Sequence, residues 1–267
     1  MDLGLAGATA VVTGGSKGMG LAIAQTLASE GASVAVMARD QRALDAAVDS
    51  LKQAGAPEAL GISVDMADGP SINAGFAEVS DRWGALNALV HTIGPGDGYF
   101  EQMDDSDWEA AFTLGTMAGV RSIRAALPML RNAEWARIVT LSAHSIQRQN
   151  PRIVAYTASK AALSSVTKNL SKSLASDGIL VNCICPGTIV TASFTEALRD
   201  VLAADGLDAT NPVDVMTWIN TNFHQPCDLG RAGLPEEVAS ITAYLASKRN
   251  GYVTGATINV DGGSDFV

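Results

Sequence analysis

Tyr156 and Lys160 are the two residues of this chain best suited to acid–base chemistry. They lie four positions apart in a helical pattern over residues 151–176, so their side chains share one helix face. An ammonium group beside a phenol favours the phenolate, which lets a tyrosine exchange a proton with a substrate oxygen near neutral pH. Taken alone, the spacing is commonplace, and surface packing explains it better. A nearby nucleotide site would change that balance.

The sequence contains such a signal at residues 10–24, where an apolar run passes through Gly14, Gly18 and Gly20 into a helical pattern. Glycines let the backbone turn sharply and approach a ligand, and the N–H groups and dipole of the next helix attract anions such as a dinucleotide pyrophosphate. Gly31 then ends the helix, and residues 33–38 have the pattern of a second strand. This is the spacing of a mononucleotide-binding βαβ unit, and it favours a nucleotide site over a simple tight turn.

Strand and helix patterns alternate along the rest of the chain. We expect further strands at residues 60–64, 86–91, 135–141, 179–185 and 255–263, and helices at 40–54, 71–83, 107–130 and 235–246. The alternation predicts an α/β fold: a doubly wound parallel sheet (Rossmann fold) of about seven strands with helices on both faces, forming a single domain over residues 1–267. Gly115 and Gly119 interrupt the pattern at 107–130 and indicate a kink or a close contact.

Residues 191–228 are polar, with breaks at Pro212 and Pro226, and are expected to be irregular. We interpret them as a mobile lid over a substrate, with a solvated insertion as the alternative. The aromatic residues of this segment suit either a modestly apolar ligand or packing.

Composition limits the possible partners. The net charge of −10 argues against nucleic acid and anionic membranes, which favour clustered Lys and Arg, so a small molecule is the expected partner. There is no basic n-region at the start and no apolar run of membrane-spanning length, and we expect a cytoplasmic protein. Three cysteines and three histidines show no metal-ligand spacing, and the cysteines are expected to be buried thiols.

Together these residues resemble the short-chain dehydrogenase/reductase family, in particular 3-oxoacyl carrier-protein reductases and hydroxysteroid dehydrogenases. The resemblance covers nearly the whole chain, and its motifs are the glycine turn after Thr13, Asp65, Tyr156 to Lys160 with two following alanines, Asn182 with Pro186-Gly187 and Thr191, and residues 255–263. It implies a homotetramer that binds NAD or NADP. Tyr156 would be the general acid/base, and Lys160 would lower its pKa and bind the nicotinamide ribose.

The resemblance also implies a cofactor site. Asp65 would contact the adenine, and Ile189 and Thr191 would lie near the carboxamide. The expected cofactor-binding residues are Gly14, Ser16, Lys17, Gly18, Met19, Gly20, Arg39, Asp65, Met66, Gly94, Tyr156, Lys160, Pro186, Gly187, Ile189 and Thr191, with no metal ligand.

The sequence departs from the family pattern at three places. His91-Thr92-Ile93-Gly94 replaces Asn-Asn-Ala-Gly, Gly115 falls on the position of the relay asparagine, and Ala143 falls on that of the catalytic serine. Ser145 lies on the same side of an extended segment as Ala143, about two residues further on, whereas adjacent Ser142 points away. We expect Ser145 to bind the substrate oxygen if the chain turns after Ala143, with Ser142 as second choice and His144 less suited.

The end of the second strand predicts which cofactor is preferred. NAD-binding members carry an Asp there, where this chain has Ala38 followed by Arg39, and Lys17 lies in the glycine turn. Both cations attract a 2′-phosphate, which predicts NADP(H) over NAD(H). The expected function is an oxidoreductase that interconverts a secondary alcohol and a ketone. The alternatives are a nucleotide-binding homologue with little redox turnover and a cofactor-assisted elimination or isomerisation.

Overall fold

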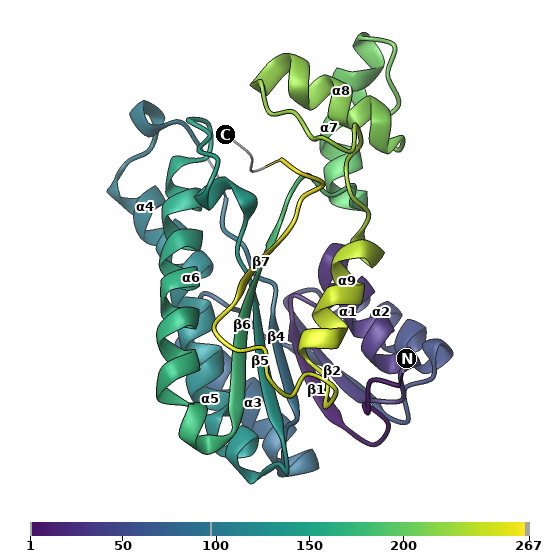
Figure 1. Cartoon of the computed structure of the whole chain (residues 1–267), viewed down its shortest axis with the longest axis vertical. Coiled ribbons are helices and arrows are strands. Elements are labelled where there is room, and N and C mark those ends of the chain that lie inside the picture. The colour runs from purple at the N-terminus through teal and green to yellow at the C-terminus, as the bar shows by residue number, and fades with distance from the viewer. Residues whose placement is uncertain (1, 97, 265–267) are drawn as a thin grey trace.

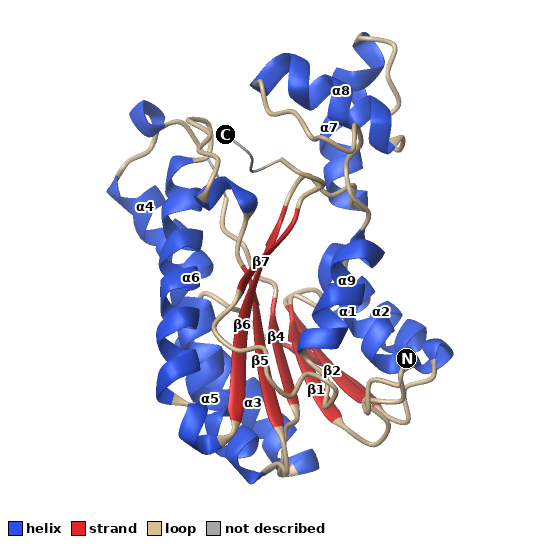
Figure 2. Ribbon diagram, viewed as in Figure 1, coloured by secondary structure: helices blue, strands red, loops and turns tan. Residues whose placement is uncertain are grey.

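One parallel sheet forms the centre of the molecule (Figures 1 and 2). The computed structural model describes residues 2–96 and 98–264; Met1 and residues 265–267, the two ends of the expected domain, lie outside the described residues, as does Asp97. Within the described part, seven strands pair in the order β3-β2-β1-β4-β5-β6-β7, all in parallel. The strands are β1 (Thr9–Thr13), β2 (Ser33–Ala38), β3 (Ala59–Ser63), β4 (Ala88–His91), β5 (Ala136–Leu141), β6 (Ile179–Pro186) and β7 (Thr257–Val260). This confirms the predicted fold.

Helices cover both faces of the sheet, because parallel strands can be joined only by crossover connections. In Figure 1, α1, α2 and α9 lie on one face, and α3, α4, α5 and α6 lie on the other. The helices are α1 (Gly18–Ser29), α2 (Gln41–Ala54), α3 (Gly69–Trp83), α4 (Asp105–Phe112), α5 (Ala118–Asn132), α6 (Val154–Ser173), α7 (Ala192–Ala204), α8 (Pro212–Phe223) and α9 (Pro235–Leu245). Shorter turns are η1 (Phe100–Gln102), η2 (Thr113–Met117), η3 (His144–Ile146) and η4 (Ala175–Asp177).

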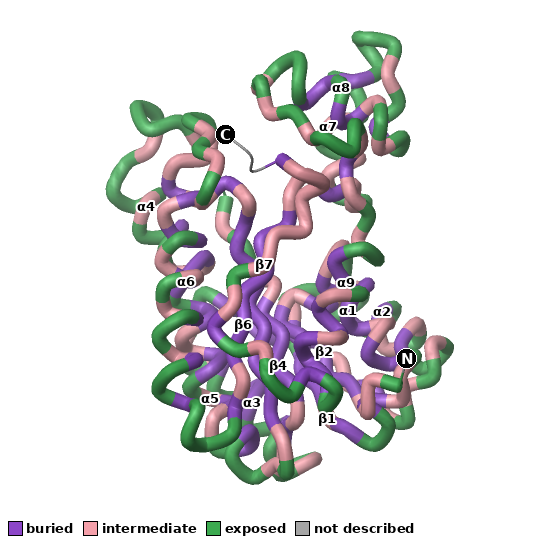
Figure 3. The backbone as a smooth tube through the Cα atoms, in the orientation of Figure 1, coloured by how far each residue is buried: buried purple, intermediate pink, exposed green. Residues whose placement is uncertain are grey.

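The strands are apolar on both sides because helices cover both. Val11 of β1 pairs with Leu89 of β4, and both pack in the cluster formed with α3 and α5. Their neighbours Val12 and Val90 pair in the same way but belong to the opposite cluster, with α1 and α9. Figure 3 shows the buried residues gathered along the sheet. Since all strands run in one direction, the loops after β1 to β6 meet at one edge, where ligands bind in such folds.

The segment at residues 191–228 is helical, so the expectation of an irregular chain is wrong. Thr191 accepts a hydrogen bond from the N–H of Phe194 and caps α7, and Asn211 caps α8 through the N–H of Val213. Between them the two helices bury an apolar cluster of their own, which includes Met216 and Trp218. Those side chains serve packing, and the amphipathic period was hidden by polar turns. Figure 1 shows both helices standing away from the sheet, as an inserted unit.

The helical pattern at residues 107–130 is divided into α4, the π-helical turn η2 and α5. Gly115 lies in η2, where an added Cβ would come within 2.1 Å of Ser159 Oγ. Gly119 lies in the first turn of α5, and its Cβ would be 3.3 Å from His91 Nε2. Of the two explanations expected for these glycines, a kink or a close contact, the structure shows the close contact at both. An asparagine at Gly115 would displace Ser159.

Two further features bear on the chemistry. Cys183 and Cys185 are buried free thiols in β6, as expected, whereas Cys227 is half-buried. In the described ranges, no helix is long and apolar enough to cross a bilayer, and no cluster of His, Cys, Asp and Glu side chains is arranged to hold a metal ion.

Candidate active site

Three glycines shape the turn between β1 and α1. Gly14 and Gly18 have φ angles of +75° and +55°, in the left-handed region that favours glycine. A Cβ on Gly20 would lie 2.2 Å from the backbone oxygen of Gly14, so the turn cannot hold a side chain there without moving. Lys17 is the N-cap residue of α1, and its side chain makes no capping hydrogen bond. Its side chain therefore leaves the first N–H groups of α1 uncapped, as an anion-binding helix end requires.

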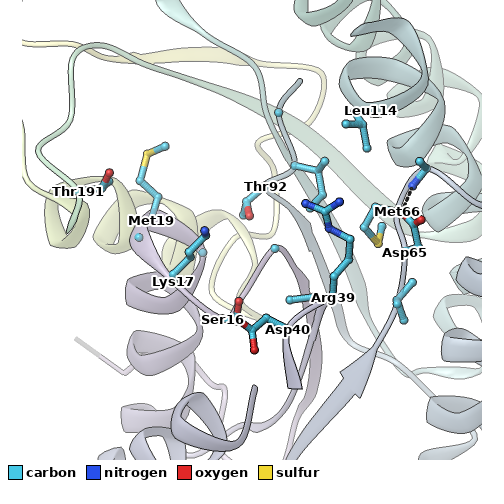
Figure 4. A pocket seen from close by; sticks show the side chains of 18 residues that line it. Ser16, Lys17, Met19, Arg39, Asp40, Asp65, Met66, Thr92, Leu114 and Thr191 are labelled. Atoms are coloured by element: carbon cyan, nitrogen blue, oxygen red, sulfur yellow. Dashed lines mark hydrogen bonds between the residues drawn. The ribbon is translucent and has the colours of Figure 1, made fainter. Parts of the chain in front are cut away.

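A cavity of about 500 Å³ opens at the carboxyl ends of β1 to β4 (Figure 4). Lys17 and Arg39 both extend their side chains toward it. Most of the residues expected to bind the cofactor line it, namely Gly14, Ser16, Lys17, Gly18, Met19, Gly20, Arg39, Asp65, Met66, Gly94 and Thr191. Glycines that admit close backbone approach, an uncapped helix end and two cations fit the pyrophosphate and phosphates of a dinucleotide.

The cavity also has wall residues that the sequence analysis did not assign to the cofactor. They are Ala38, Asp40, Val64, Ala67, Thr92, Ile93 and Leu114. All but Leu114 lie at the end of β2 or just after β2, β3 or β4, and that position was the signal that could have identified them. Five of the expected cofactor-binding residues do not line this cavity, namely Tyr156, Lys160, Pro186, Gly187 and Ile189. Ile189 lines a separate cavity of about 610 Å³ beside Asp261. The structure thus gathers the residues expected around the adenine and pyrophosphate more completely than those expected around the nicotinamide.

Lys160 lies on α6 together with Tyr156, and its ammonium is buried. Its Nζ donates hydrogen bonds to the backbone oxygens of Ile93 at 2.6 Å and Leu141 at 2.7 Å. The same nitrogen lies 6.0 Å from the centre of the Tyr156 ring. Burial lowers the pKa of Lys160 to about 8, so the group is still mainly protonated at neutral pH. β4 and β5 therefore hold a cation beside the phenol at a defined position.

Gly94 joins this pair to the dinucleotide cavity. It lines the cavity, and a Cβ at this position would lie 3.5 Å from Tyr156 Cε2 and 3.9 Å from Lys160 Nζ. Any larger side chain would stand between the cavity and the pair. Gly94 thus connects the tyrosine–lysine pair to the cavity that the glycine turn lines, although the two motifs are far apart in the sequence.

The two serines proposed to bind the substrate oxygen are both buried and both directed at α6. Ser142 donates a hydrogen bond to the backbone oxygen of Lys160 at 2.9 Å, and Ser145 accepts one from Thr157 Oγ1 at 2.9 Å. The chain does turn after Ala143, into η3, as the assignment of Ser145 requires. Neither serine lines the dinucleotide cavity. The oxygen-binding role of Ser145 or Ser142 stays a prediction.

Single alanine variants test these serines. We expect Ser145→Ala to lower turnover about 10-fold or more, as loss of a hydrogen bond to a developing charge does, and Ser142→Ala to lower it less. Steady-state kinetics with thermal unfolding as a control for folding provide the measurement. A loss confined to Ser142→Ala would reverse the assignment, and full activity in both would show that Tyr156 works without a serine partner.

His91 replaces an asparagine of the family pattern with a neutral buried imidazole. It is fully buried in β4, and its Nδ1 pairs with Thr13 Oγ1 at 2.8 Å. No described group hydrogen-bonds to its Nε2. Burial lowers the pKa of His91 to about 3, with a smaller effect from the charge of Lys160. The imidazole is therefore unprotonated throughout the neutral range.

Because His91 is buried and neutral, we expect the folded protein to lose stability as the pH falls. The unfolded chain protonates His91 near pH 6.5 but the folded protein only near pH 3, so the unfolded state binds more protons in this window. The free energy of unfolding should therefore fall as the pH falls through it, by up to about 1.4 kcal/mol per pH unit from this group. His91→Asn keeps a hydrogen-bonding side chain and should flatten the dependence. Urea unfolding at a series of pH values measures this, and parallel curves for the two proteins would contradict it.

Comparison with known proteins assigns this site to a family. A model of the enoyl-(acyl carrier protein) reductase family matches residues 14–265. The dehydrogenase/reductase SDR family member 4 of Caenorhabditis elegans is 33% identical over 259 residues, which cover 96% of this chain and 95% of that protein. The chain belongs to the short-chain dehydrogenase/reductase family.

Other relatives of this short-chain dehydrogenase/reductase agree over its full length. The 3-oxoacyl-acyl-carrier-protein reductase FabG of Staphylococcus aureus is 32% identical over 257 residues, which cover 96% of this chain and 97% of that protein. The structure of L-sorbose reductase from Gluconobacter frateurii, complexed with NADPH and L-sorbose, matches with a TM-score of 0.92 and 30% identity over 100% of both chains. These relatives are named reductases or dehydrogenases, and the chain is an NAD(P)-dependent oxidoreductase of their family.

Proposed function

We propose that this short-chain dehydrogenase/reductase uses NADP(H) to interconvert a secondary alcohol and a ketone. The observation that carries the proposal is the position of Tyr156 and Lys160 beside Gly94, at the border of the dinucleotide cavity. A buried lysine costs free energy of folding, and no structural ion pair accounts for it among the described residues. Such a group next to a cofactor cavity is typical of an active site.

Tyr156 is the general acid/base of the proposed reaction. Its phenol donates a proton to the substrate oxygen during reduction, and its phenolate takes the proton back during oxidation. Lys160, whose ammonium is held by the backbone oxygens of Ile93 and Leu141, favours the phenolate. The bound nicotinamide supplies or accepts the hydride.

Different residues of the cavity would bind different parts of the proposed cofactor. The glycine turn and the first turn of α1 would hold the pyrophosphate, and Asp65 and Met66, which line the same cavity, would hold the adenine. The Asp65 carboxylate accepts the N–H of Ala67 at 2.9 Å and so orders that wall. The family resemblance places Ile189 and Thr191 near the nicotinamide carboxamide and Lys160 at the nicotinamide ribose.

The preference for NADP(H) is supported by charge. Arg39 and Lys17 line the cavity and bring two positive charges to it. Asp40 also lines it, and the Oδ1 of its carboxylate accepts hydrogen bonds from the N–H groups of Arg42 and Ala43 and caps α2. L-sorbose reductase and actinorhodin polyketide ketoreductase, both similar in structure, are described with NADPH.

We expect Arg39→Ala to weaken NADPH binding about 10- to 100-fold and NADH binding little, because only NADPH carries the phosphate that Arg39 would bind. Fluorescence titration with both cofactors measures the effect. Arg42→Ala is the matched control, since it removes the same charge from exposed α2 outside the cavity. Tighter NADH binding by the wild type, or equal losses for both cofactors, would contradict the preference.

The reaction itself is tested by following nicotinamide absorbance with a panel of ketones and secondary alcohols. The proposal requires substrate-dependent oxidation of NADPH or reduction of NADP, abolished without Tyr156. Cofactor binding without any turnover across the panel would favour a binding or regulatory role, and product formation without a change in absorbance would favour elimination or isomerisation.

The partner in this proposal is a small carbonyl or alcohol compound, and the enzyme is a homotetramer. The number of four subunits comes from the family resemblance, and β7 offers an edge for association, because it pairs with β6 on one side only and is half-exposed at Ile258 and Val260. Native proteins seldom leave such an edge uncovered. Sedimentation equilibrium at micromolar concentration tests the assembly, and a monomer would contradict it.

A further inference from the structure

Arg152 lies where three loops at the carboxyl edge of the sheet meet. It belongs to the loop between β5 and α6, four residues before Tyr156. Its Cζ lies 4.3 Å from the ring centre of Phe223, the last residue of α8, and 5.8 Å from that of Tyr99, between β4 and α4. The three loops follow β4, β5 and β6, which are neighbours in the sheet. One guanidinium therefore touches segments that lie far apart in the chain.

These loops belong to the carboxyl edge of the sheet, where the dinucleotide cavity also opens. The helical insertion formed by α7 and α8 begins at Thr191, which lines the dinucleotide cavity and approaches Gly18. It ends at Phe223, on Arg152. Ligands of open α/β sheets bind beyond the carboxyl ends of the strands, so a substrate next to Tyr156 would lie at the edge of the sheet to which the Arg152 loop belongs.

Within the described part of the chain, the Arg152 side chain has N–H donors that are free to bind a ligand. It is exposed, and the ion pairs among the described residues do not include it. Aromatic rings hold a guanidinium by its face, which leaves its N–H groups directed outward along the plane. Those donors match the two oxygens of a carboxylate in a parallel pair of hydrogen bonds. In a chain of net charge −10, this is a local attraction for an anion.

The ring beneath Arg152 is held in place by its own neighbours. Phe223 makes an edge contact with Trp218, with ring centres 5.3 Å apart. The next residue, His224, ends α8 with a φ of +53°, and its backbone oxygen accepts a hydrogen bond from Arg148 Nη2 at 3.3 Å. The guanidinium of Arg152 thus meets a positioned surface, and an ordered donor loses less entropy when it binds.

We propose that Arg152 is a specificity-determining residue that binds a carboxylate on the substrate. The preferred substrates are then ketones or secondary alcohols that carry a carboxylate. The inference rests on the proposed function and adds a substrate class to it. A carboxylate held at Arg152 orients the substrate, so that its carbonyl oxygen faces the Tyr156 phenol.

Acid and ester pairs with the same carbon skeleton test this assignment. The probes are levulinate with methyl levulinate and acetoacetate with methyl acetoacetate, each measured with NADPH. Arg152→Met is the informative variant, because it keeps an unbranched apolar stem against Phe223 and Tyr99 and removes only the charge. Lys52→Met on exposed α2 is the control for net charge.

We expect the wild type to prefer each acid over its ester in kcat/KM, and Arg152→Met to lose about 10- to 100-fold on the acids and less than about 3-fold on the esters. Lys52→Met should keep the wild-type preference. Equal losses on acid and ester would show that Arg152 only holds the lid, and this would overturn the proposal. A wild-type preference for the esters would also overturn it.

A binding measurement separates this inference from the proposed reaction. Calorimetry of levulinate and methyl levulinate on the NADPH complex requires no turnover. Tighter binding of the acid by the wild type, lost in Arg152→Met, supports the carboxylate site even if no probe is reduced. Equal binding of acid and ester, or no binding of either, overturns it even if neutral ketones are reduced.

Discussion

Tyr156→Phe is expected to lower turnover by about 100- to 10,000-fold while NADPH affinity changes less than about 3-fold, because the variant loses the transferable proton and keeps the ring. The ring lies against Gly94, at 3.5 Å from the position of an added Cβ, so its packing contact with the wall of the cavity remains. Turnover is measured from nicotinamide absorbance and affinity by fluorescence titration. Tyr252→Phe is the matched control, since that hydroxyl belongs to a fully exposed side chain.

Lys160→Ala should differ from Tyr156→Phe in a way that identifies the two roles. It removes the cation beside the phenol and also leaves the backbone oxygens of Ile93 and Leu141 without their donor. Both turnover and cofactor affinity should therefore fall. Substantial activity in Tyr156→Phe would show that another group transfers the proton, and it would favour elimination or isomerisation. Unchanged cofactor affinity in Lys160→Ala would show that Lys160 does not bind the nicotinamide ribose.

Gly20→Ala is expected to weaken NADPH binding by about 100-fold or more. The added Cβ would lie 2.2 Å from the oxygen of Gly14 and 2.9 Å from Thr92 Oγ1, and the first of these contacts is with backbone that cannot rotate away. The turn must move, and the N–H groups of α1 would then no longer be positioned to hydrogen-bond the pyrophosphate. Overpacking of this kind also costs about 1–3 kcal/mol of stability.

The measurement for Gly20→Ala is calorimetric titration with NADPH, together with circular dichroism and thermal unfolding. Gly251→Ala is the control, because Gly251 has a negative φ and open space around it, so a methyl group adds no contact there. A folded Gly20→Ala protein with wild-type affinity would place the pyrophosphate elsewhere.

The parts of the fold predicted from the sequence are those set by neighbouring residues. Apolar runs followed by helical patterns predict the strands and helices, and their alternation predicts the parallel sheet and the edge at which ligands bind. The glycine turn is equally local, because φ angles at Gly14 and Gly18 and the contact between Gly20 and Gly14 involve only residues of one turn. Tyr156 and Lys160 share a helix face for the same reason.

Features that depend on distant residues could not be predicted in this way. The helices of the insertion at residues 191–228 are stabilised by a cluster that α7 and α8 bury together, which polar turns conceal in the sequence. Gly115 is required because Ser159 of another helix occupies the space of its side chain. Ser142 and Ser145 are drawn to α6 by acceptors and donors on that helix.

The same distinction applies to charge. Nothing near His91 in the sequence indicates an unprotonated imidazole; its pKa is lowered because the sheet and α5 exclude water from it. In the sequence, Arg152 cannot be distinguished from any other surface arginine. Only the folded structure shows that Tyr99 and Phe223, which follow two other strands, lie against its guanidinium. Local sequence specifies the backbone path and the helix faces, whereas burial and contacts between loops set protonation and recognition, because both depend on groups that only folding brings together.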